Sequence, residues 1–148
     1  MNTKEPITKI EGADARRKQR EPNRVFVVDD DPSMRNALNN LLRSAGFEPQ
    51  LFTSAEEFLD TDRLDSPSCL ILDIQLPGLS GLELQRELSV ANVSLPIIFI
   101  SGYVDDTTRV RAMEAGAIAC FSKPFCDRDL LHAIHLSFNA SAATSNST

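Results

Sequence analysis

Val25-Phe-Val-Val-Asp-Asp-Asp31 is the stretch that decides the fold, because four apolar residues in a row are followed at once by three carboxylates. A short run that is apolar throughout is typical of a strand buried on both faces, as in a parallel sheet. Further apolar runs end at Asp73, Ser101 and Lys123. Since the carboxyl ends of parallel strands lie at one edge of a sheet, we expect these polar side chains to meet in one crevice.

Strand and helix signals alternate through the middle of the chain. Short strand-like runs are separated by segments whose apolar residues recur at helical spacing, and Gly46 and Gly116 stand where helices would end. Ser54 and Glu57 have the spacing of a capping box at a helix start. The predicted strands are residues 25–28, 48–52, 69–72, 97–100 and 117–121, and the predicted helices are residues 34–45, 54–59, 84–91, 105–115 and 127–138.

Five successive strand–helix repeats predict an α/β fold. Its core would be a doubly wound, five-stranded parallel sheet with helices on both faces and right-handed crossovers. We expect one domain, at residues 24–138, because residues 1–23 are polar and aperiodic and residues 139–148 are small and polar. The first of these end segments is predicted to be a flexible N-terminal extension and the second a disordered C-terminal tail.

The composition argues against several classes of protein. With 42% hydrophobic and 24% charged residues, the chain is typical of a globular protein. No apolar run approaches the roughly 18–20 residues that span a bilayer, and no apolar signal-like segment follows Met1. The three cysteines form no CxxC pair and no disulfide framework. We therefore expect a reducing, cytoplasmic compartment and no membrane partner.

The charge is unevenly distributed along the chain. Residues 24–148 hold nine Lys/Arg and seventeen Asp/Glu, and such an acidic domain is not expected to bind nucleic acid directly. Residues 1–23 are slightly basic, with most of the positive charge at residues 16–20. We interpret this basic cluster as part of a solvated tail, the alternative being contact with phosphates or with an acidic partner.

The carboxylates of Asp29, Asp30 and Asp73 form the first candidate site. Two carboxylates ~4 Å apart repel by about 4 kcal/mol near a protein surface, so a cluster of three requires a bound proton or a cation. Ligands that are all oxygen atoms favour Mg²⁺, or Mn²⁺, over softer metals. The alternative is that Asp29 to Asp31 only cap the helix that starts near Pro32, but Asp73 at another strand end favours a metal site.

Asp73 is also the candidate nucleophile, because a carboxylate can accept a phosphoryl group and form an acyl phosphate. Lys123 would pair with a phosphoryl oxygen as a point charge, and the Ser101 hydroxyl would donate a hydrogen bond to another. Taken alone, Lys123 could be a surface lysine and Ser101 a helix cap. Their shared position at strand ends predicts metal-dependent phosphoryl chemistry instead.

Four ordered motifs resemble those of the receiver domain of two-component response regulators. They are Val27-Val-Asp-Asp-Asp31, Asp73-Ile-Gln-Leu-Pro-Gly-Leu-Ser-Gly81, Ile100-Ser-Gly102 and Lys123-Pro-Phe125. The resemblance covers residues 24–138 and is closest to receivers of the FixJ type. It implies a flavodoxin-like receiver fold, with strand order 2-1-3-4-5 and five helices.

The resemblance also implies a role for each acidic residue. Asp73 would be the phosphoacceptor and a metal ligand. Asp30 would bind Mg²⁺ directly, and Asp29 would order the metal's waters. The backbone carbonyl of Gln75 would be the third protein ligand.

The remaining site residues would transmit the signal. Ser101 and Lys123 would contact the phosphoryl group and couple it to a conformational change, and the Lys123–Pro124 peptide bond would be cis. One position departs from the pattern, because the family usually has Tyr or Phe three residues before the lysine and this chain has Cys120. The next residue cannot replace it, since strand neighbours face opposite sides. Either the change proceeds without a ring at this position or Tyr103 takes part.

The sequence therefore predicts a single-domain response regulator of a phosphorelay, a signalling switch rather than an enzyme. It would accept its phosphoryl group from a sensor histidine kinase or a histidine phosphotransfer protein. The output would be a contact with a protein that the sequence does not identify, since no helix-turn-helix pattern follows residue 138. By resemblance, the readout surface and candidate dimer face would comprise the fourth helix, the fifth strand and the last helix.

Three alternatives remain. A degenerate receiver would act as a phosphorylation-independent interaction module, although every site residue is present. An aspartyl-phosphate phosphatase of the haloacid dehalogenase type would use Asp29 and Asp31, which are two residues apart, but would leave Asp73 without a role. A flavodoxin-like cofactor binder is disfavoured, because the three successive carboxylates would repel a phosphate group.

Overall fold

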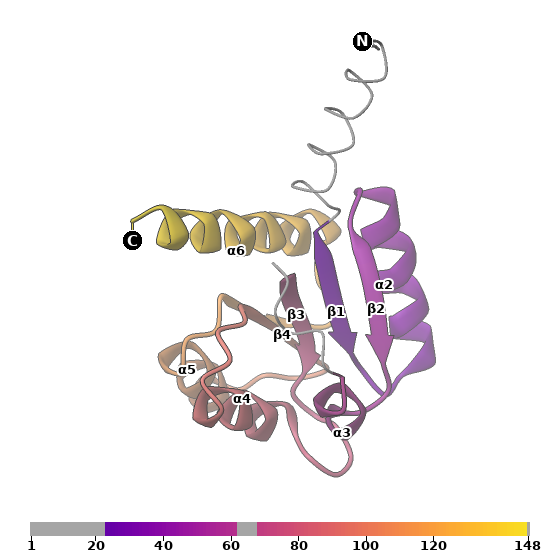
Figure 1. Cartoon of the computed structure of the whole chain (residues 1–148). Coiled ribbons are helices and arrows are strands. Elements are labelled where there is room, and N and C mark those ends of the chain that lie inside the picture. The colour runs from indigo at the N-terminus through magenta and orange to yellow at the C-terminus, as the bar shows by residue number, and fades with distance from the viewer. Residues whose placement is uncertain (1–22, 62–67, 148) are drawn as a thin grey trace.

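The structure, a computed structural model, describes residues 23–61 and 68–147 (Figure 1). The predicted N-terminal extension therefore lies outside the described residues, apart from Asn23. The strands are β1 (Arg24–Val28), β2 (Glu48–Phe52), β3 (Ser68–Asp73), β4 (Ile97–Ser101) and β5 (Ala119–Ser122). The helices are α2 (Pro32–Ser44), α3 (Ala55–Leu59), α4 (Gly81–Val90), α5 (Asp106–Glu114) and α6 (Asp127–Ser147).

The five strands form one parallel sheet in the order β2-β1-β3-β4-β5, which confirms the predicted fold. β1 is the second strand from one edge and lies between β2 and β3, so the chain reverses its direction of growth after β2. At such a reversal, the loops that leave the carboxyl ends of neighbouring strands diverge and open a crevice. Asp29 directly follows β1, and Asp73 is the last residue of β3.

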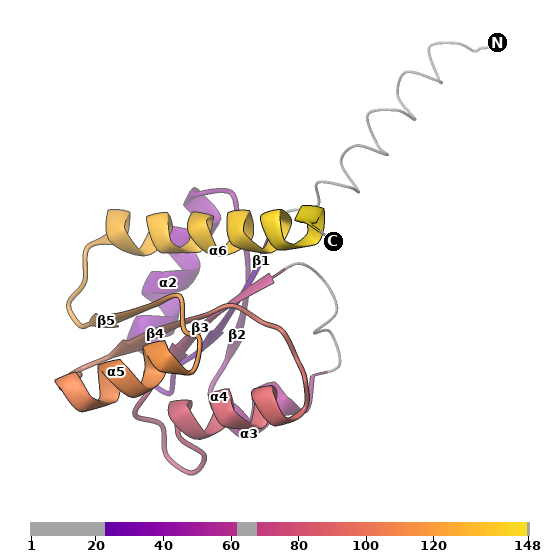
Figure 2. The ribbon, with the colours of Figure 1, turned by 90° about the vertical axis from the view of Figure 1, so that its left-hand side faces the viewer.

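The helices cover the sheet in two layers (Figure 2). Within β1 and β3, successive side chains of Val25–Val28 and Cys69–Leu72 point to opposite faces and are fully buried, which explains why both runs are apolar throughout. On one face Phe26 and Leu70 belong to a core shared with α3, α4 and α5. On the other face Val25 and Ile71 belong to a core shared with α2 and α6. A packed layer of helices thus supports each face of the sheet that carries the site.

Some element ends differ from the prediction. β5 begins at Ala119 rather than residue 117, because the amide of Ala117 donates to the carbonyl of Ala112 and so still belongs to the end of α5. The last helix continues to Ser147 rather than stopping near Phe138, and residues 139–147 are helical instead of forming an unordered tail. That segment contains neither Gly nor Pro, so no residue in it interrupts the helix.

The predicted capping box is found at a different helix. Ser54 does cap α3 by accepting from the amide of Glu57, but the Glu57 carboxylate accepts from the amide of Thr53 instead. The reciprocal pair forms between Ser80 and Glu83 at the start of α4. α4 therefore starts at a fixed point, directly after the loop that follows β3. Within residues 23–61 and 68–147, no helix has the length and apolar character needed to cross a membrane.

Candidate functional site

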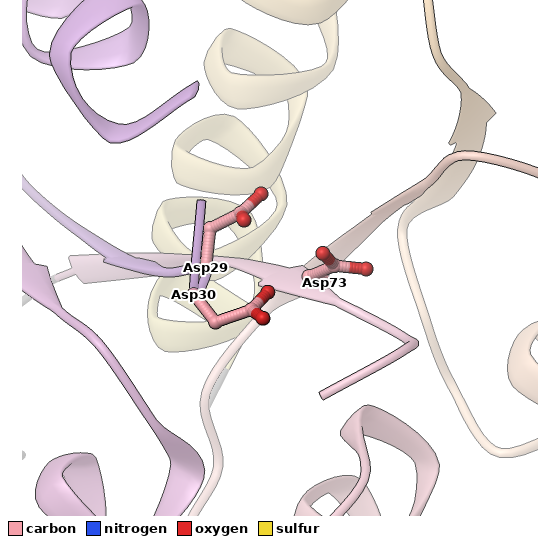
Figure 3. A group of neighbouring side chains, drawn as sticks. All are labelled: Asp29, Asp30 and Asp73. Atoms are coloured by element: carbon pink, nitrogen blue, oxygen red, sulfur yellow. The ribbon is translucent and has the colours of Figure 1, made fainter. Parts of the chain in front are cut away.

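The carboxylates of Asp29, Asp30 and Asp73 meet at the carboxyl edge of the sheet (Figure 3). One oxygen atom from each lies within 4.8 Å of the others. Asp29 and Asp73 are buried and Asp30 is exposed, so the cluster opens to solvent on the Asp30 side. The sequence prediction that these three residues converge is correct, and it rests on their shared position at the ends of adjacent strands.

The successive aspartates have different surroundings in the structure. Asp31 is the N-cap of α2, and its carboxylate accepts from the amide of Ser33 at 2.9 Å. Asp29 instead faces the site, where one carboxylate oxygen accepts from the amide of Asp31 at 2.9 Å. The backbone carbonyl of Asp29 accepts from the guanidinium of Arg35 at 2.7 Å. Asp29 is therefore fixed through both its side chain and its main chain.

The phosphoacceptor candidate is held by the loop that follows it. One carboxylate oxygen of Asp73 accepts from the amide of Gln75 at 3.0 Å. The amide of Gly81 donates to the carbonyl of Ile74 at 2.9 Å, which brings the start of α4 against the end of β3. A Cβ atom at Gly81 would lie 2.4 Å from the Asp73 carbonyl oxygen, so only glycine permits this approach. The sequence analysis missed this constraint, although Gly81 lies in a quoted motif.

Lys123 links the two buried carboxylates. Its ammonium lies 3.0 Å from Oδ2 of Asp29 and 3.3 Å from Oδ2 of Asp73. The amide of Lys123 donates to the carbonyl of Ser101 at 2.6 Å, which ties the end of β5 to the end of β4. The Lys123–Pro124 peptide bond is cis, as the resemblance implies. The lysine is thus positioned by three of the strands that form the site.

Burial and neighbouring charges shift the pKa values of Asp73 and Lys123. Burial raises the pKa of Asp73 and the charge of Asp29 raises it further, while the Gln75 amide and the Lys123 ammonium oppose the rise. Burial alone would lower the pKa of Lys123, but the hydrogen bonds and charges of Asp29 and Asp73 outweigh it and raise that pKa. The Lys123 ammonium is therefore retained at neutral pH, and Asp73 carries its charge at a cost.

We expect Asp73→Asn to raise the melting temperature at neutral pH in the presence of EDTA, by about a few degrees. Because folding raises the pKa of Asp73 above 3.8, the stabilisation of its protonated form is complete below pH 3.8 and is lost as the pH rises through the folded-state value. An uncharged amide removes this loss.

The advantage of Asp73→Asn should therefore shrink as the pH falls toward 4. Thermal unfolding followed by circular dichroism at both pH values measures it. Glu114→Gln, which removes an exposed carboxylate, is the control and should change little. A melting temperature for Asp73→Asn below that of the wild type at neutral pH would show that the Asp73–Lys123 pair is net stabilising.

The Ser101 hydroxyl is the third feature of the site. Ser101 is fully buried at the end of β4, and its Oγ makes no hydrogen bond within the part of the chain that the structure describes. A buried hydroxyl without a partner is rare in folded proteins, because it forfeits its interactions with water. β4 pairs with β3, with Ile100 opposite Asp73, so Ser101 lies one position beyond the phosphoacceptor candidate. A ligand with oxygen atoms would supply the missing partner.

The residues considered for signal transmission have different surroundings. Cys120 is buried in the core shared with α3, α4 and α5, whereas the next residue, Phe121, packs on the opposite core, as strand alternation requires. Tyr103 is 71% exposed. A residue that the sequence analysis missed contacts Cys120: the guanidinium of Arg109, on α5, donates to the Cys120 carbonyl. No local pattern could have revealed this contact between two elements.

The donor set fits a hard divalent cation. Asp29, Asp30 and Asp73 offer only carboxylate oxygens, which suit Mg²⁺ and Mn²⁺. Three carboxylates and the Lys123 ammonium leave an excess of negative charge in a largely buried site, which a divalent cation would balance. The exposed Asp30 provides the open side through which a hydrated ion could enter.

Comparisons with known proteins agree with this geometry. A model of the response regulator receiver domain matches residues 25–135. Nodulation protein W of Bradyrhizobium diazoefficiens is 54% identical over 110 residues, covering 74% of this chain and 48% of that protein. Response regulator protein TmoT of Ectopseudomonas mendocina is 46% identical over 110 residues, covering 74% of this chain and 50% of that protein. The chain spans about half the length of these curated relatives.

Solved structures lead to the same family. The structure of response regulator StyR has a TM-score of 0.79 and 45% identity, covering 85% of this chain and 64% of that chain. The structure of FixJ-N has a TM-score of 0.74 and 34% identity, covering 80% of this chain and 95% of that chain. The chain therefore belongs to the response regulator receiver domain family, the signalling switches of two-component systems.

Proposed function

We propose that Asp73 accepts a phosphoryl group from a sensor histidine kinase or a histidine phosphotransfer protein, and that the resulting acyl phosphate switches a protein-interaction surface. The observation that carries the proposal is the pairing of the buried Asp73 carboxylate with the Lys123 ammonium at 3.3 Å, beside the unpartnered Ser101 hydroxyl. A candidate nucleophile, a cation and a free hydrogen-bond donor thus lie at the ends of separate strands, along one edge of the sheet.

The transfer of the phosphoryl group forms one bond and breaks one. A carboxylate oxygen of Asp73 forms a bond to phosphorus, while the bond from phosphorus to the donor's imidazole nitrogen breaks and its electron pair stays on that nitrogen. The product is an acyl phosphate on Asp73. Lys123 and Ser101 would then donate hydrogen bonds to the phosphoryl oxygens, the lysine from its ammonium and the serine from its free hydroxyl.

The proposal also assigns the ligands of a bound Mg²⁺ ion. Asp30 and Asp73 would bind Mg²⁺ directly, Asp29 would hold its waters, and the backbone carbonyl of Gln75 would complete the protein ligands. When bound, the cation would reduce the repulsion between the carboxylates and an incoming phosphoryl group. The support for this assignment is the convergence of three carboxylate oxygens within 4.8 Å.

A structural change caused by phosphorylation would be transmitted to the rest of the domain through Lys123. The ammonium pairs with Asp29 and Asp73 in the unmodified protein. A phosphoryl group adds about −1.5 to −2 charges at neutral pH, which gives Lys123 and Ser101 a new shared partner. Because Lys123 directly follows β5 and Ser101 ends β4, a shift of these groups would move the start of the loops that lead to α5 and α6.

The proposed readout surface is the face of α5, β5 and α6. Val110 and Met113 of α5 and Leu136 of α6 are large apolar residues that are 51%, 43% and 48% exposed. Exposed apolar side chains of this size are common at sites of protein contact. An output protein, or a second copy of this chain in a dimer, would bind there. A cytoplasmic location is part of the same proposal, supported by three cysteines that form no disulfide.

The alternatives are less well supported. The phosphatase would need Asp31 as a proton donor in the site, but the Asp31 carboxylate caps α2. A degenerate receiver would be expected to lack part of the phosphoryl site, whereas Asp29, Asp30, Asp73, Ser101 and Lys123 all lie at one edge of the sheet.

The proposal predicts that incubation with acetyl phosphate and Mg²⁺ adds the mass of one phosphoryl group to the intact protein. In EDTA the gain should fall by at least about 100-fold in rate, since a metal contributes several kcal/mol to such transition states. Electrospray mass spectrometry of the intact chain measures both. An unchanged mass in Mg²⁺ would favour the degenerate receiver.

A further inference from the structure

Helix α5 is weakly held to the rest of the domain. Its only buried residue is Ala112, and four of its nine residues are charged. Among the described residues, two side-chain hydrogen bonds connect it to other elements. Gln85 of α4 donates to the Ala112 carbonyl at 3.2 Å, and Arg109 donates to the Cys120 carbonyl of β5. With so little apolar burial, α5 depends on these polar contacts for its position.

The hydrogen bond from Arg109 reaches β5, the strand that leads to Lys123. Cys120 lies three residues before Lys123 and pairs with Phe99 of β4, and the same ladder places Ser122 opposite Ser101. The carboxyl end of this ladder therefore lies at the phosphoryl site. Arg109 connects α5 to the strand whose end carries the site's lysine.

The small side chain at position 120 makes this contact possible. Cys120 is buried on the face of β5 that α5 covers, in the same core as Ala112 and Ala117. A long side chain can lie beside such small neighbours, and Arg109 is itself partly buried there. The charge of Arg109 also lowers the pKa of the Cys120 thiol, against the larger rise caused by burial, so the guanidinium lies near the thiol as well as the carbonyl.

We propose that Arg109 is a positioning residue that ties α5 to β5 and makes α5 respond to phosphorylation of Asp73. This inference rests on the proposed function and adds to it the element through which the signal leaves the site. The guanidinium of Arg109 would couple the site to α5 in place of an aromatic ring, since position 120 is a cysteine and the ring of Tyr103 is exposed. A movement at the end of β5 would be passed to α5 through the Arg109–Cys120 bond.

A displacement of α5 would change two surfaces at once. Its exposed Val110 and Met113 belong to the proposed readout face. Its Arg111 and Ala115 line a groove of about 270 Å³ between α4 and α5, together with Leu82, Gln85, Arg86, Ser89 and Val90. A partner that bound either surface would therefore sense the position of α5.

Hydrogen–deuterium exchange of residues 106–114 tests the proposal. Wild type, Arg109→Gln and Arg111→Gln are compared with and without acetyl phosphate and Mg²⁺, and intact mass gives the phosphorylated fraction of each sample. Both variants remove one positive charge from α5, but only Arg109 bonds β5. Arg109→Gln should raise basal exchange in α5 several-fold and abolish its change on phosphorylation, whereas Arg111→Gln should behave as wild type.

Two further variants sharpen the test. Cys120→Ala should keep the response, because the acceptor is a backbone carbonyl. Arg109→Lys, which keeps a charged donor, should restore part of it. The proposal is overturned if phosphorylated Arg109→Gln shows the wild-type change in α5, or if phosphorylated wild type shows none. A sample that gains no phosphoryl group would instead overturn the proposed function and the coupling with it, while the basal exchange still decides whether Arg109 holds α5.

Discussion

Lys123→Met is expected to reduce the rate of phosphorylation by acetyl phosphate at least about 100-fold, the usual cost of removing a charge-stabilising donor from an active site. The substitution keeps most of the side chain's length but removes the ammonium that lies 3.0 Å from Asp29 and 3.3 Å from Asp73. Two buried carboxylates would then face each other and an incoming phosphoryl group without a cation from the protein. Intact mass spectrometry over a time course gives the rate.

The same variant should also be less stable, because Asp29 is fully buried and would lose the ammonium that balances its charge. Breaking a buried ion pair typically costs about 3–5 kcal/mol, and solvent that reaches the site on the exposed Asp30 side should reduce this figure here. Arg128→Met removes an equal charge from an exposed position on α6 and serves as the control for both measurements. A Lys123→Met protein that is phosphorylated at the control rate would remove the lysine from the mechanism.

Gly81→Ala is expected to destabilise the domain by about 2–4 kcal/mol, within the range measured for substitutions that overpack a rigid site. A Cβ atom at position 81 would lie 2.4 Å from the carbonyl oxygen of Asp73 and 2.8 Å from Cα of Ile74. Both are backbone atoms, which cannot turn aside as a flexible side chain can. The direction is informative, because alanine is favoured over glycine by about 1 kcal/mol in an ordinary helix.

Urea denaturation of Gly81→Ala measures the loss. Phosphorylation should slow as well, since the clash displaces the main chain of the phosphoacceptor itself. Gly102→Ala is a matched control, because a Cβ atom there would have no atom within 4 Å and the position lies next to the same site. Equal stability of the two variants would mean that α4 moves away from β3 at little cost.

The sheet and the acidic cluster were predictable from sequence for the same physical reason. A strand buried on both faces must be apolar along its length, so the first polar residue after such a run marks the strand's carboxyl end. Asp29, Asp73 and Ser101 each mark one of these ends, or follow it directly. The parallel topology then brings them together, and their convergence follows without knowledge of any side-chain contact.

The features that sequence did not reveal depend on contacts between distant segments. Whether Glu57 caps its own helix or bonds Thr53 is decided by the path of the chain before the helix. The close approach of Gly81 to Asp73 and the bond from Arg109 to Cys120 each join two elements of the folded domain. Such contacts leave no periodic signal, so local patterns cannot show them.

The most direct test of the account is to locate the phosphoryl group after reaction with acetyl phosphate and Mg²⁺. Reduction with borohydride converts an aspartyl phosphate to homoserine, and tandem mass spectrometry of the digested protein then identifies the modified position. We predict homoserine at position 73, and none at Asp29 or Asp30, whose carboxylates lie in the same cluster. Homoserine at either of those positions, or a phosphoryl group on a residue outside the cluster, would contradict the assignment of Asp73 as the acceptor.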